Sequence, residues 1–180
     1  MQSRHQTGFT MIELIVVIVI LGVLAAVALP RFTNLQRDAR IAKLNAARGA
    51  VGAASAMVHG TAMARQGQVQ PACPSGGAVP NVNAAGNGTI CTENGPVTVA
   101  LLYPAGTLAG IVASAGIVQG TGVPTAAQLA AEGYVTAAVA GGIQIQVTGG
   151  TAAATCSFNY VAPAALGQAP TISAINSAGC

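Results

Sequence analysis

Few side chains of this 180-residue chain can take part in acid–base chemistry. The carboxylates and imidazoles of the whole sequence are Glu13, Asp38, Glu93, Glu132, His5 and His59. They are too scattered to suggest a catalytic triad or a pair of carboxylates, and no phosphate-binding glycine motif accompanies them. We therefore predict a protein that is not an enzyme and needs no cofactor, with His59 as a packing or surface residue.

The four cysteines, Cys73, Cys91, Cys156 and Cys180, offer a second kind of chemistry. An even number of cysteines in an exported domain predicts disulfide bonds, although four of them allow three pairings. Zinc is the competing use, but zinc sites favour closely spaced ligands, such as two cysteines separated by two residues. The cysteines here are widely spaced, so we expect disulfides and no metal site.

Glu13 is the acid with the most unusual surroundings. It stands just before Leu14–Leu29, sixteen residues without a polar side chain. An ionised carboxylate in hydrocarbon costs a few kcal/mol on insertion scales, which makes such a residue a candidate for function. Either a cation offsets that cost, or the side chain reaches back to lipid headgroups at the edge of the span.

The apolar run itself is long enough to be a membrane anchor. At about 1.5 Å per residue, roughly 20 helical residues cross the hydrocarbon core of a bilayer. Arg4 precedes the run, and the positive-inside bias then keeps the N-terminus in the cytoplasm. The alternative is a cleaved secretory signal peptide, for which the Ala-Val-Ala sequence at 26–28 is a suitable site. Glu13 and the helical pattern that continues past Pro30 count against that alternative.

Charged residues are scarce and unevenly placed. They make up 6% of the chain, against roughly 25% in ordinary soluble domains. All seven cations lie at or before Arg65, and the rest of the chain carries only Glu93 and Glu132 as charges. Because a nucleic-acid-binding domain usually carries a basic patch, we do not expect nucleic acid as a partner. The arginines of the helix are expected to be solvated or to pair subunits.

The N-terminal residues resemble a known processing signal. The class III signal of type IV pilins is similar to this order of residues: Gly8, Phe9, Thr10, Glu13, an aliphatic run, Gly22 and Pro30. The resemblance implies that a prepilin peptidase cuts between Gly8 and Phe9 and methylates the new amine of Phe9. Glu13 then becomes the fifth residue of the mature chain.

On this resemblance, Glu13 takes part in filament assembly. The amine of Phe9 on a neighbouring subunit meets Glu13 only when the two subunits are staggered along their axes, so the pairing rewards one register. The implied partners are copies of the same chain, the prepilin peptidase and the inner-membrane pilus assembly machinery. The implied location is the bacterial inner membrane, with one pass and a cytoplasmic N-terminus, and afterwards an extracellular pilus.

Later stretches resemble the mannose-sensitive haemagglutinin subgroup of type IV pilins. They are "PRFTNLQRDARIAKLNAARGAVGAASAMVHG", "LLYPAGTLAGIVASAGI" and "CSFNYV". The subgroup implies adhesion to a host or surface receptor that the sequence does not identify. One alternative is a type II secretion major pseudopilin, whose family binds calcium through acids near the C-terminus, although this chain has no acid after Glu132. The other alternative is a secreted soluble binding protein.

Between Arg31 and Arg65 the sequence predicts a continuation of the same helix. Apolar residues recur there at roughly helical spacing, namely Phe32, Leu35, Ala39, Ala42, Val51, Ala54, Val58 and Ala62. Gly67 followed by Pro71 ends the helix. Pro30 removes one helical hydrogen bond, and filaments of the resembled family loosen the helix near this point. We therefore predict a kink or a melted segment from Gly22 to Pro30.

The rest of the chain predicts a small antiparallel sheet. Asn94-Gly95 lies between residues 89–93 and 96–100 and is typical of a hairpin turn, while residues 143–148 and 155–161 alternate like half-buried strands. Short helices are expected at 107–115 and 125–132. The second of these starts with a Thr125–Gln128 capping box and is followed by Gly133.

The predicted fold is α+β and pilin-like, with a long N-terminal helix packed on the sheet. Residues 1–8 are the leader, 9–30 the membrane anchor and filament-core helix, 31–66 the amphipathic half of the same helix, and 67–180 the globular head. We predict the pairs Cys73–Cys91 and Cys156–Cys180, the second of which resembles the disulfide-bounded C-terminal region of the family. Each bond would contribute roughly 3 kcal/mol by closing its loop.

Overall fold

The computed structural model describes residues 9–73 and 80–180, and for residues 29–34 it describes the backbone only. The predicted leader, residues 1–8, lies outside the described residues. The chain divides into two compact units, residues 1–38 and 39–180. The helix from Ala39 onward belongs to the unit that holds the sheets.

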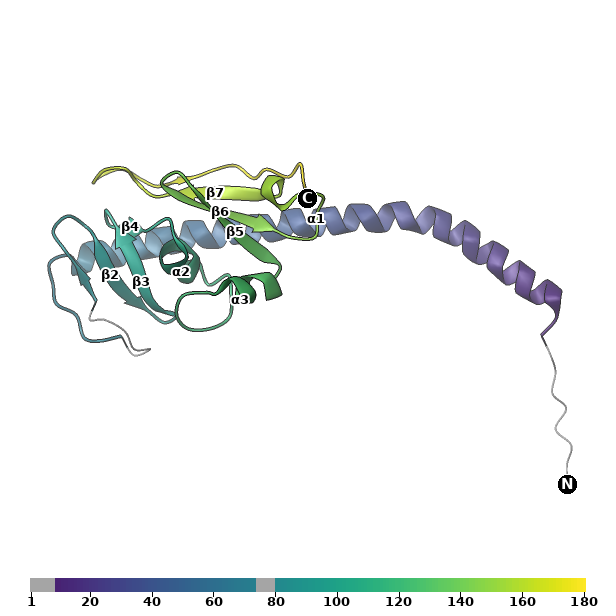
Figure 1. Ribbon diagram of the computed structural model, residues 1–180, viewed down its shortest axis with the longest axis horizontal. Helices are drawn as coiled ribbons and strands as arrows, with labels where there is room; N and C mark the ends of the chain where they lie inside the picture. Colours follow the sequence, from purple (N-terminus) through teal and green to yellow (C-terminus); the bar gives the residue numbers. More distant parts are fainter. Residues whose placement is uncertain (1–8, 74–79) are drawn as a thin grey trace, which may run out of the picture. The chain divides into compact units, whose positions relative to one another are not determined.

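Helix α1 (Met11–Arg65) is followed by two antiparallel sheets of four strands each. The first sheet has the order β1 (Asn81–Val82), β2 (Gly88–Thr92), β3 (Gly95–Ala100) and β4 (Tyr103–Pro104). The second has the order β5 (Tyr134–Val139), β6 (Gly142–Val147), β7 (Ser157–Val161) and β8 (Thr171–Ile172). The α+β, pilin-like fold is as predicted, but two small sheets replace the single one expected, because helical turns and loops separate β4 from β5 (Figure 1).

From Ala39 onward, one face of α1 supplies the core. Its buried side chains recur every three or four residues: Leu44, Ala47, Val51, Ala54, Val58 and Ala62. The first four belong to a cluster with side chains of the second sheet, such as Phe158 and Tyr160. The last two belong to a cluster with side chains of the first sheet, such as Ile90 and Val97. Each sheet thus packs on its own stretch of α1 (Figure 1).

The predicted apolar face of this helix is correct in its second half and wrong in its first. Every predicted position from Val51 onward is buried, whereas Leu35, Ala39 and Ala42 are exposed. A helix turns about 100° per residue, so the stripe that contains Val51 runs back to Leu44, whereas Ala42 lies about 180° from Val51, on the opposite face. The prediction joined two different faces because small residues are common on both.

The melted segment that was one form of the predicted break is not present in this single chain, and the other form, a kink, stays a prediction. The backbone is helical at Gly22 and at Pro30, and α1 continues to Arg65. A proline removes only one hydrogen bond of the ladder, so the surrounding turns keep the segment helical. Phe32 is among the residues whose side chains are not described. Loosening of the helix on assembly stays a prediction.

The hairpin predicted around Asn94-Gly95 is present, with its turn one residue earlier. Thr92 lies opposite Gly95 in the β2–β3 pairing, so the two turn residues are Glu93 and Asn94. Gly95 has a φ of 117°, a conformation that favours glycine. The glycine is therefore needed at the start of β3 and not at the centre of the turn.

The predicted short helices of the head are also present. Residues 107–115 form a π-helical turn, η1 (Leu108–Val112), and one α-helical turn, α2 (Ala113–Ala115). Helix α3 (Ala126–Ala131) starts with the Thr125–Gln128 capping box. The predicted strand at 155–161 is β7, preceded by the 3-10 turn η2 (Ala153–Thr155).

Candidate assembly site at the start of the long helix

The first turn of α1 holds Glu13 in a capping box. Its Oε2 atom accepts one hydrogen bond from the backbone N–H of Thr10 at 2.9 Å and another from the Thr10 hydroxyl at 2.7 Å. The Thr10 Oγ1 atom in turn accepts a hydrogen bond from the backbone N–H of Glu13 at 3.3 Å. A threonine followed three residues later by a glutamate is typical of a helix N-terminus. That spacing is the sequence signal for this role of Thr10, which the prediction for Glu13 missed.

The side chains around this capping box are exposed. Phe9 is 88% and Met11 80% exposed, and every residue from 9 to 27 is exposed. Residues 11–28 have a mean hydropathy of 3.0, and by length and composition this part of α1 is able to cross a membrane. An exposed apolar surface of this size marks a contact with lipid or protein.

The other residues predicted to act in processing and assembly are only partly visible. Phe9 is described, whereas Gly8, on the other side of the predicted cleavage bond, lies outside the described residues. Gly22 is exposed, and a Cβ atom added there would meet nothing within 4 Å. Gly22 therefore leaves room for a neighbouring helix to approach closely.

The four cysteines form the two pairs expected from the sequence. Cys73 is bonded to Cys91, with Cα atoms 5.5 Å apart, and Cys156 to Cys180, with Cα atoms 4.8 Å apart. Both separations lie in the usual range for disulfides. The second bond joins the start of β7 to the C-terminal residue and lies in the core cluster of the second sheet.

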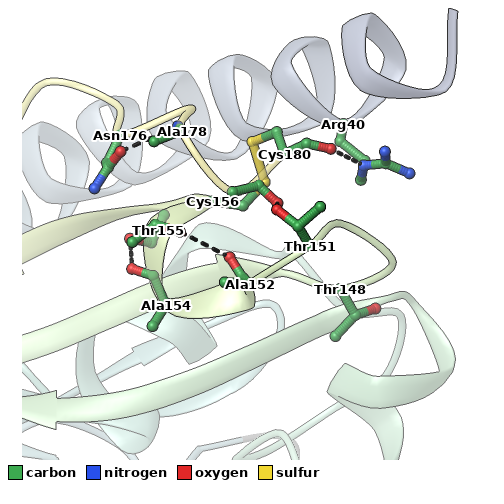
Figure 2. Close-up of a disulfide and its surroundings, with 12 residues drawn as sticks. Arg40, Thr148, Thr151, Ala152, Ala154, Thr155, Cys156, Asn176, Ala178 and Cys180 are labelled. Carbon is green, nitrogen blue, oxygen red and sulfur yellow. Dashed lines mark hydrogen bonds between the residues drawn. A yellow bond between two sulfur atoms is a disulfide. The ribbon is translucent and has the colours of Figure 1, made fainter. Parts of the chain in front are cut away.

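Two arginines of α1 bind the main chain of the C-terminal region. The Nε atom of Arg40 donates a hydrogen bond of 2.6 Å to the carbonyl oxygen of Cys180, next to the disulfide (Figure 2). The Nε atom of Arg48 donates one of 2.8 Å to the carbonyl oxygen of Ser173. Hydrogen bonds from a charged donor are stronger than neutral ones, so both arginines hold the C-terminal region on the helix.

Lys43, which lies between Arg40 and Arg48 in α1, also binds a main-chain carbonyl group of the head. Its Nζ atom donates a hydrogen bond to the carbonyl oxygen of Glu132 and lies 4.3 Å from the centre of the Tyr134 ring. The prediction that the arginines of the helix are solvated or pair subunits therefore left out the contacts that Arg40 and Arg48 make within the chain, and it did not cover Lys43. These side chains bind carbonyl groups of their own head, which the sequence pattern did not indicate.

His59 is a packing residue, as predicted. Its ring stacks on that of Tyr103, with 3.9 Å between centroids, and its Nδ1 atom lies 3.0 Å from the carbonyl oxygen of Leu102. Leu101 and Leu102 form the β3–β4 turn with φ angles of 52° and 69°. Such angles are unusual for leucine, and His59 helps to hold the turn in this conformation.

Comparisons with known proteins match limited parts of the chain. The family described as the prokaryotic N-terminal methylation motif matches residues 3–29, which include Gly8, Phe9 and Glu13. The type IV narrow pilus major component PilA5 of Thermus thermophilus is 50% identical over 50 residues, 28% of this chain and 43% of the relative. The type II secretion system core protein G of Pseudomonas aeruginosa is 49% identical over 41 residues, 23% of this chain and 29% of the relative.

Part of the chain is thus similar to a type IV pilin and to a type II secretion protein. The methylation motif and the exposed apolar part of α1 fit a membrane-anchored pilin that assembles into an extracellular filament. The pilin-like similarity spans less than half the length of each of these relatives. No solved structure matches the chain.

Proposed function

We propose that this chain is the structural subunit of a type IV pilus. A peptidase removes the leader after Gly8, methylates Phe9, and leaves a subunit that polymerises through the first part of α1. The observation that carries the proposal is the position of Glu13, one acid in the first turn of an exposed apolar helix of 18 residues. The function is structural and not enzymatic.

The physical reason is the cost of placing that acid among apolar groups. Inside a bundle of such helices, an ionised carboxylate needs a cation nearby. Within the described part of residues 1–28, Glu13 is the one ionisable side chain. Cleavage after Gly8 supplies the missing cation, because it turns the backbone nitrogen of Phe9 into an amine. A neighbouring copy brings its amine to Glu13 in one axial stagger, which fixes the register of the filament.

The proposal also implies where the subunit is located before assembly. The apolar helix holds it in the bacterial inner membrane with the N-terminus in the cytoplasm, where the prepilin peptidase and the assembly machinery act on it. The head, with both disulfides, then lies on the oxidising side of the membrane, where such bonds form and persist. After assembly the same apolar surface is buried among copies of the chain.

A type II secretion pseudopilin is the second candidate, and the similarity to core protein G favours it. The two candidates share the N-terminal signal, but deletion of the gene for the chain should abolish a different cellular activity in each case. Deletion of the chain removes surface filaments and leaves protein secretion intact if it is a pilin. The opposite pattern identifies a pseudopilin.

Adhesion is the use that we propose for the filament. Its support is the resemblance of residues 101–117 and 156–161 to the mannose-sensitive haemagglutinin subgroup. Cells that lack the chain should then bind less well to a target surface, and purified filaments should compete with intact cells for that surface. Equal binding by cells with and without filaments would contradict this use.

The direct test is the mass of the mature N-terminus in material sheared from the cell surface. The proposal predicts a subunit that begins at Phe9 and carries one N-terminal methyl group. A subunit that begins at Leu29 would identify an ordinary signal peptide and a secreted soluble protein. Negative-stain images of the same material should show filaments built from the Phe9 form.

A further inference from the structure

We propose that the head binds an acidic sugar in a groove beside the C-terminal end of α1. The groove has a volume of about 950 Å³ and is lined by the last turns of α1, by residues 68–72, and by β2 with the turn that follows it. Its volume is within the range of small-molecule sites. The inference goes beyond the proposed function, because the groove belongs to the head, whereas assembly depends on the first turn of α1.

Part of the groove presents hydrogen-bond donors. Arg65 ends α1, and its Nη1 atom donates a hydrogen bond of 2.9 Å to the Oε1 atom of Gln70. Gln70 also lines the groove and is only 8% exposed, yet its Nε2 atom has no hydrogen-bond partner within the described residues. A buried amide donor without an acceptor is rare and costs free energy. A ligand oxygen that accepts from Gln70 removes this cost.

An anionic oxygen suits these donors best. The guanidinium of Arg65 stays charged, and its planar fork binds carboxylates through two parallel hydrogen bonds. Among the described residues that line the groove, Arg65 is the one cation. Its bond to Gln70 brings the amide and the guanidinium together. The groove therefore has one place that favours a carboxylate.

The turn after β2 suits hydroxyl groups. Glu93 and Asn94 are the two turn residues, and both line the groove. The Glu93 carboxylate forms no hydrogen bond or ion pair with another residue of the described chain. A carboxylate accepts hydrogen bonds, and an asparagine side chain both donates and accepts them. Because Glu93 repels a second acid, the ligand carries hydroxyl groups here and not another carboxylate.

Apolar side chains make up much of the remaining surface. Val58 and Ile90 belong to the core cluster of the first sheet and also line the groove, and Met57 beside them is 73% exposed. Apolar surfaces with a few polar groups are typical of small-molecule sites. A fatty acid would bind these side chains but leave Glu93 and Asn94 without partners. An acidic sugar instead offers a carboxylate, hydroxyl groups and apolar ring faces together.

The test is the binding of a disaccharide to the unassembled full-length chain in detergent, measured by calorimetry. The probe is glucuronosyl-galactose, which carries one carboxylate. Lactose is its neutral counterpart, because it has a hydroxymethyl group in place of that carboxylate. The acidic disaccharide should bind about tenfold more tightly than lactose, since only it forms a charged pair with Arg65. Hexanoate and an acetylated diglutamate peptide represent a fatty acid and an acidic peptide, and both should bind less tightly than the disaccharide.

Variants separate the proposed donors from the net charge of the chain. Gln70→Glu keeps an acceptor for Arg65 and removes the Nε2 donor, so the affinity for the acidic disaccharide should fall about tenfold or more. Gln168→Glu is the matched control, because it makes the same charge change at an exposed glutamine outside the groove. Its affinity should not change. Arg65→Lys keeps the charge but not the fork and should weaken binding about fivefold.

Methyl signals show where the ligand binds. Met57 lines the groove, whereas Met63, which is also exposed on α1, does not. In a chain labelled with 13C at its methionine methyl groups, the acidic disaccharide should shift the Met57 signal and leave the Met63 signal in place.

Several results would overturn the inference. Lactose, hexanoate or the peptide binding as tightly as the acidic disaccharide would contradict an acidic-sugar site. Unchanged affinity in Gln70→Glu or in Arg65→Lys would contradict the role of the donors, as would an equal loss in Gln168→Glu. Equal shifts of Met57 and Met63 would place the ligand elsewhere. Binding is measured without filaments, so this inference and the proposed function fail in separate experiments.

Discussion

Arg40 binds the carbonyl oxygen of Cys180 through its Nε atom, 2.6 Å away, while the sulfur of Cys180 is bonded to that of Cys156. The C-terminal residue is thus joined to α1 by a charged hydrogen bond and to the start of β7 by a covalent one (Figure 2). Both sulfur atoms belong to buried residues of the core cluster that includes the helix. The C-terminal region is therefore part of the structural frame of the head.

Replacement of Arg40 by methionine should destabilise the head. The variant keeps an unbranched apolar stem and removes the donor to Cys180, so the free energy of unfolding should fall by about 1–2 kcal/mol. Urea unfolding of the processed subunit in detergent measures this loss. Arg40→Lys retains the charge but not the geometry of the guanidinium and should fall in between. An unchanged urea midpoint for Arg40→Met would show that the bond contributes nothing.

Removal of either disulfide should weaken the head, the second more than the first. The loops closed by the two bonds are similar, with separations of 18 and 24 residues, so loop entropy predicts about 3 kcal/mol for each. Cys156 and Cys180 are both buried in the core cluster, whereas Cys91 is partly exposed. The Cys156→Ala/Cys180→Ala double variant should therefore lose packing as well. Equal loss in the Cys73→Ala/Cys91→Ala variant would contradict the extra packing role.

The stability of the head should fall in strongly alkaline solution because of Tyr160. Burial raises the pKa of Tyr160 to about 12, and its hydroxyl donates to the Pro104 carbonyl oxygen at 2.8 Å. The unfolded tyrosine has a pKa of about 10. The contribution of the neutral phenol is therefore complete below pH 10 and is lost as the pH rises from about 10 to 12.

The measurement is the free energy of unfolding at a series of pH values. It should fall by up to about 1.4 kcal/mol per pH unit between about pH 10 and 12 as a result of this group. Tyr160→Phe removes the titrating group, so its free energy of unfolding should fall less steeply with pH, by up to that amount per pH unit. Below pH 10 this variant should be less stable than the unmodified chain, because it lacks the hydrogen bond to Pro104. Parallel curves for the two proteins would show that Tyr160 is not responsible. Tyr134, whose pKa burial also raises, is present in both.

The β3–β4 turn should be stabilised by a residue suited to its conformation. Leu101 has a φ of 52°, and its N–H donates to the Asn87 Oδ1 atom at 3.0 Å. Two-residue turns with positive φ favour asparagine and glycine, so Leu101→Asn should raise the free energy of unfolding by about 0.5–1 kcal/mol. Leu102→Asn is the control. It should destabilise the head, because Leu102 packs on the core cluster of the first sheet. A lower free energy of unfolding for Leu101→Asn, as well as for Leu102→Asn, would show that the backbone of Leu101 is not strained.

Local patterns in the sequence predicted local structure well. The alternation in residues 143–147, the Thr125–Gln128 capping box and the hairpin near Asn94 each depend on residues close in the chain. The same holds for Glu13, because its bond partner Thr10 is three residues away. The candidate assembly site is thus the part of the molecule that is easiest to derive from the sequence alone.

Contacts between distant residues could not be predicted in this way. Arg40 and Cys180 are 140 residues apart, and the acceptor is a main-chain oxygen that no side-chain pattern reveals. The number of sheets depends on the path of residues 105–133, which connect β4 to β5. That path is set by contacts between residues far apart in the sequence. The start of the buried stripe at Leu44 was obscured by the small residues that occur on several faces of α1.

The filament yield of Glu13→Leu tests the central claim most directly. The measurement compares surface filaments sheared from cells that express Glu13→Leu, the unmodified chain or Glu93→Gln, whose exposed acid lies in the head. We predict that Glu13→Leu is processed to the Phe9 form and yields no filaments, because it lacks the acid that pairs with a neighbouring amine. Glu93→Gln should yield as many filaments as the unmodified chain. Normal filaments from Glu13→Leu would contradict the account, since the chain would then polymerise without the charge of Glu13.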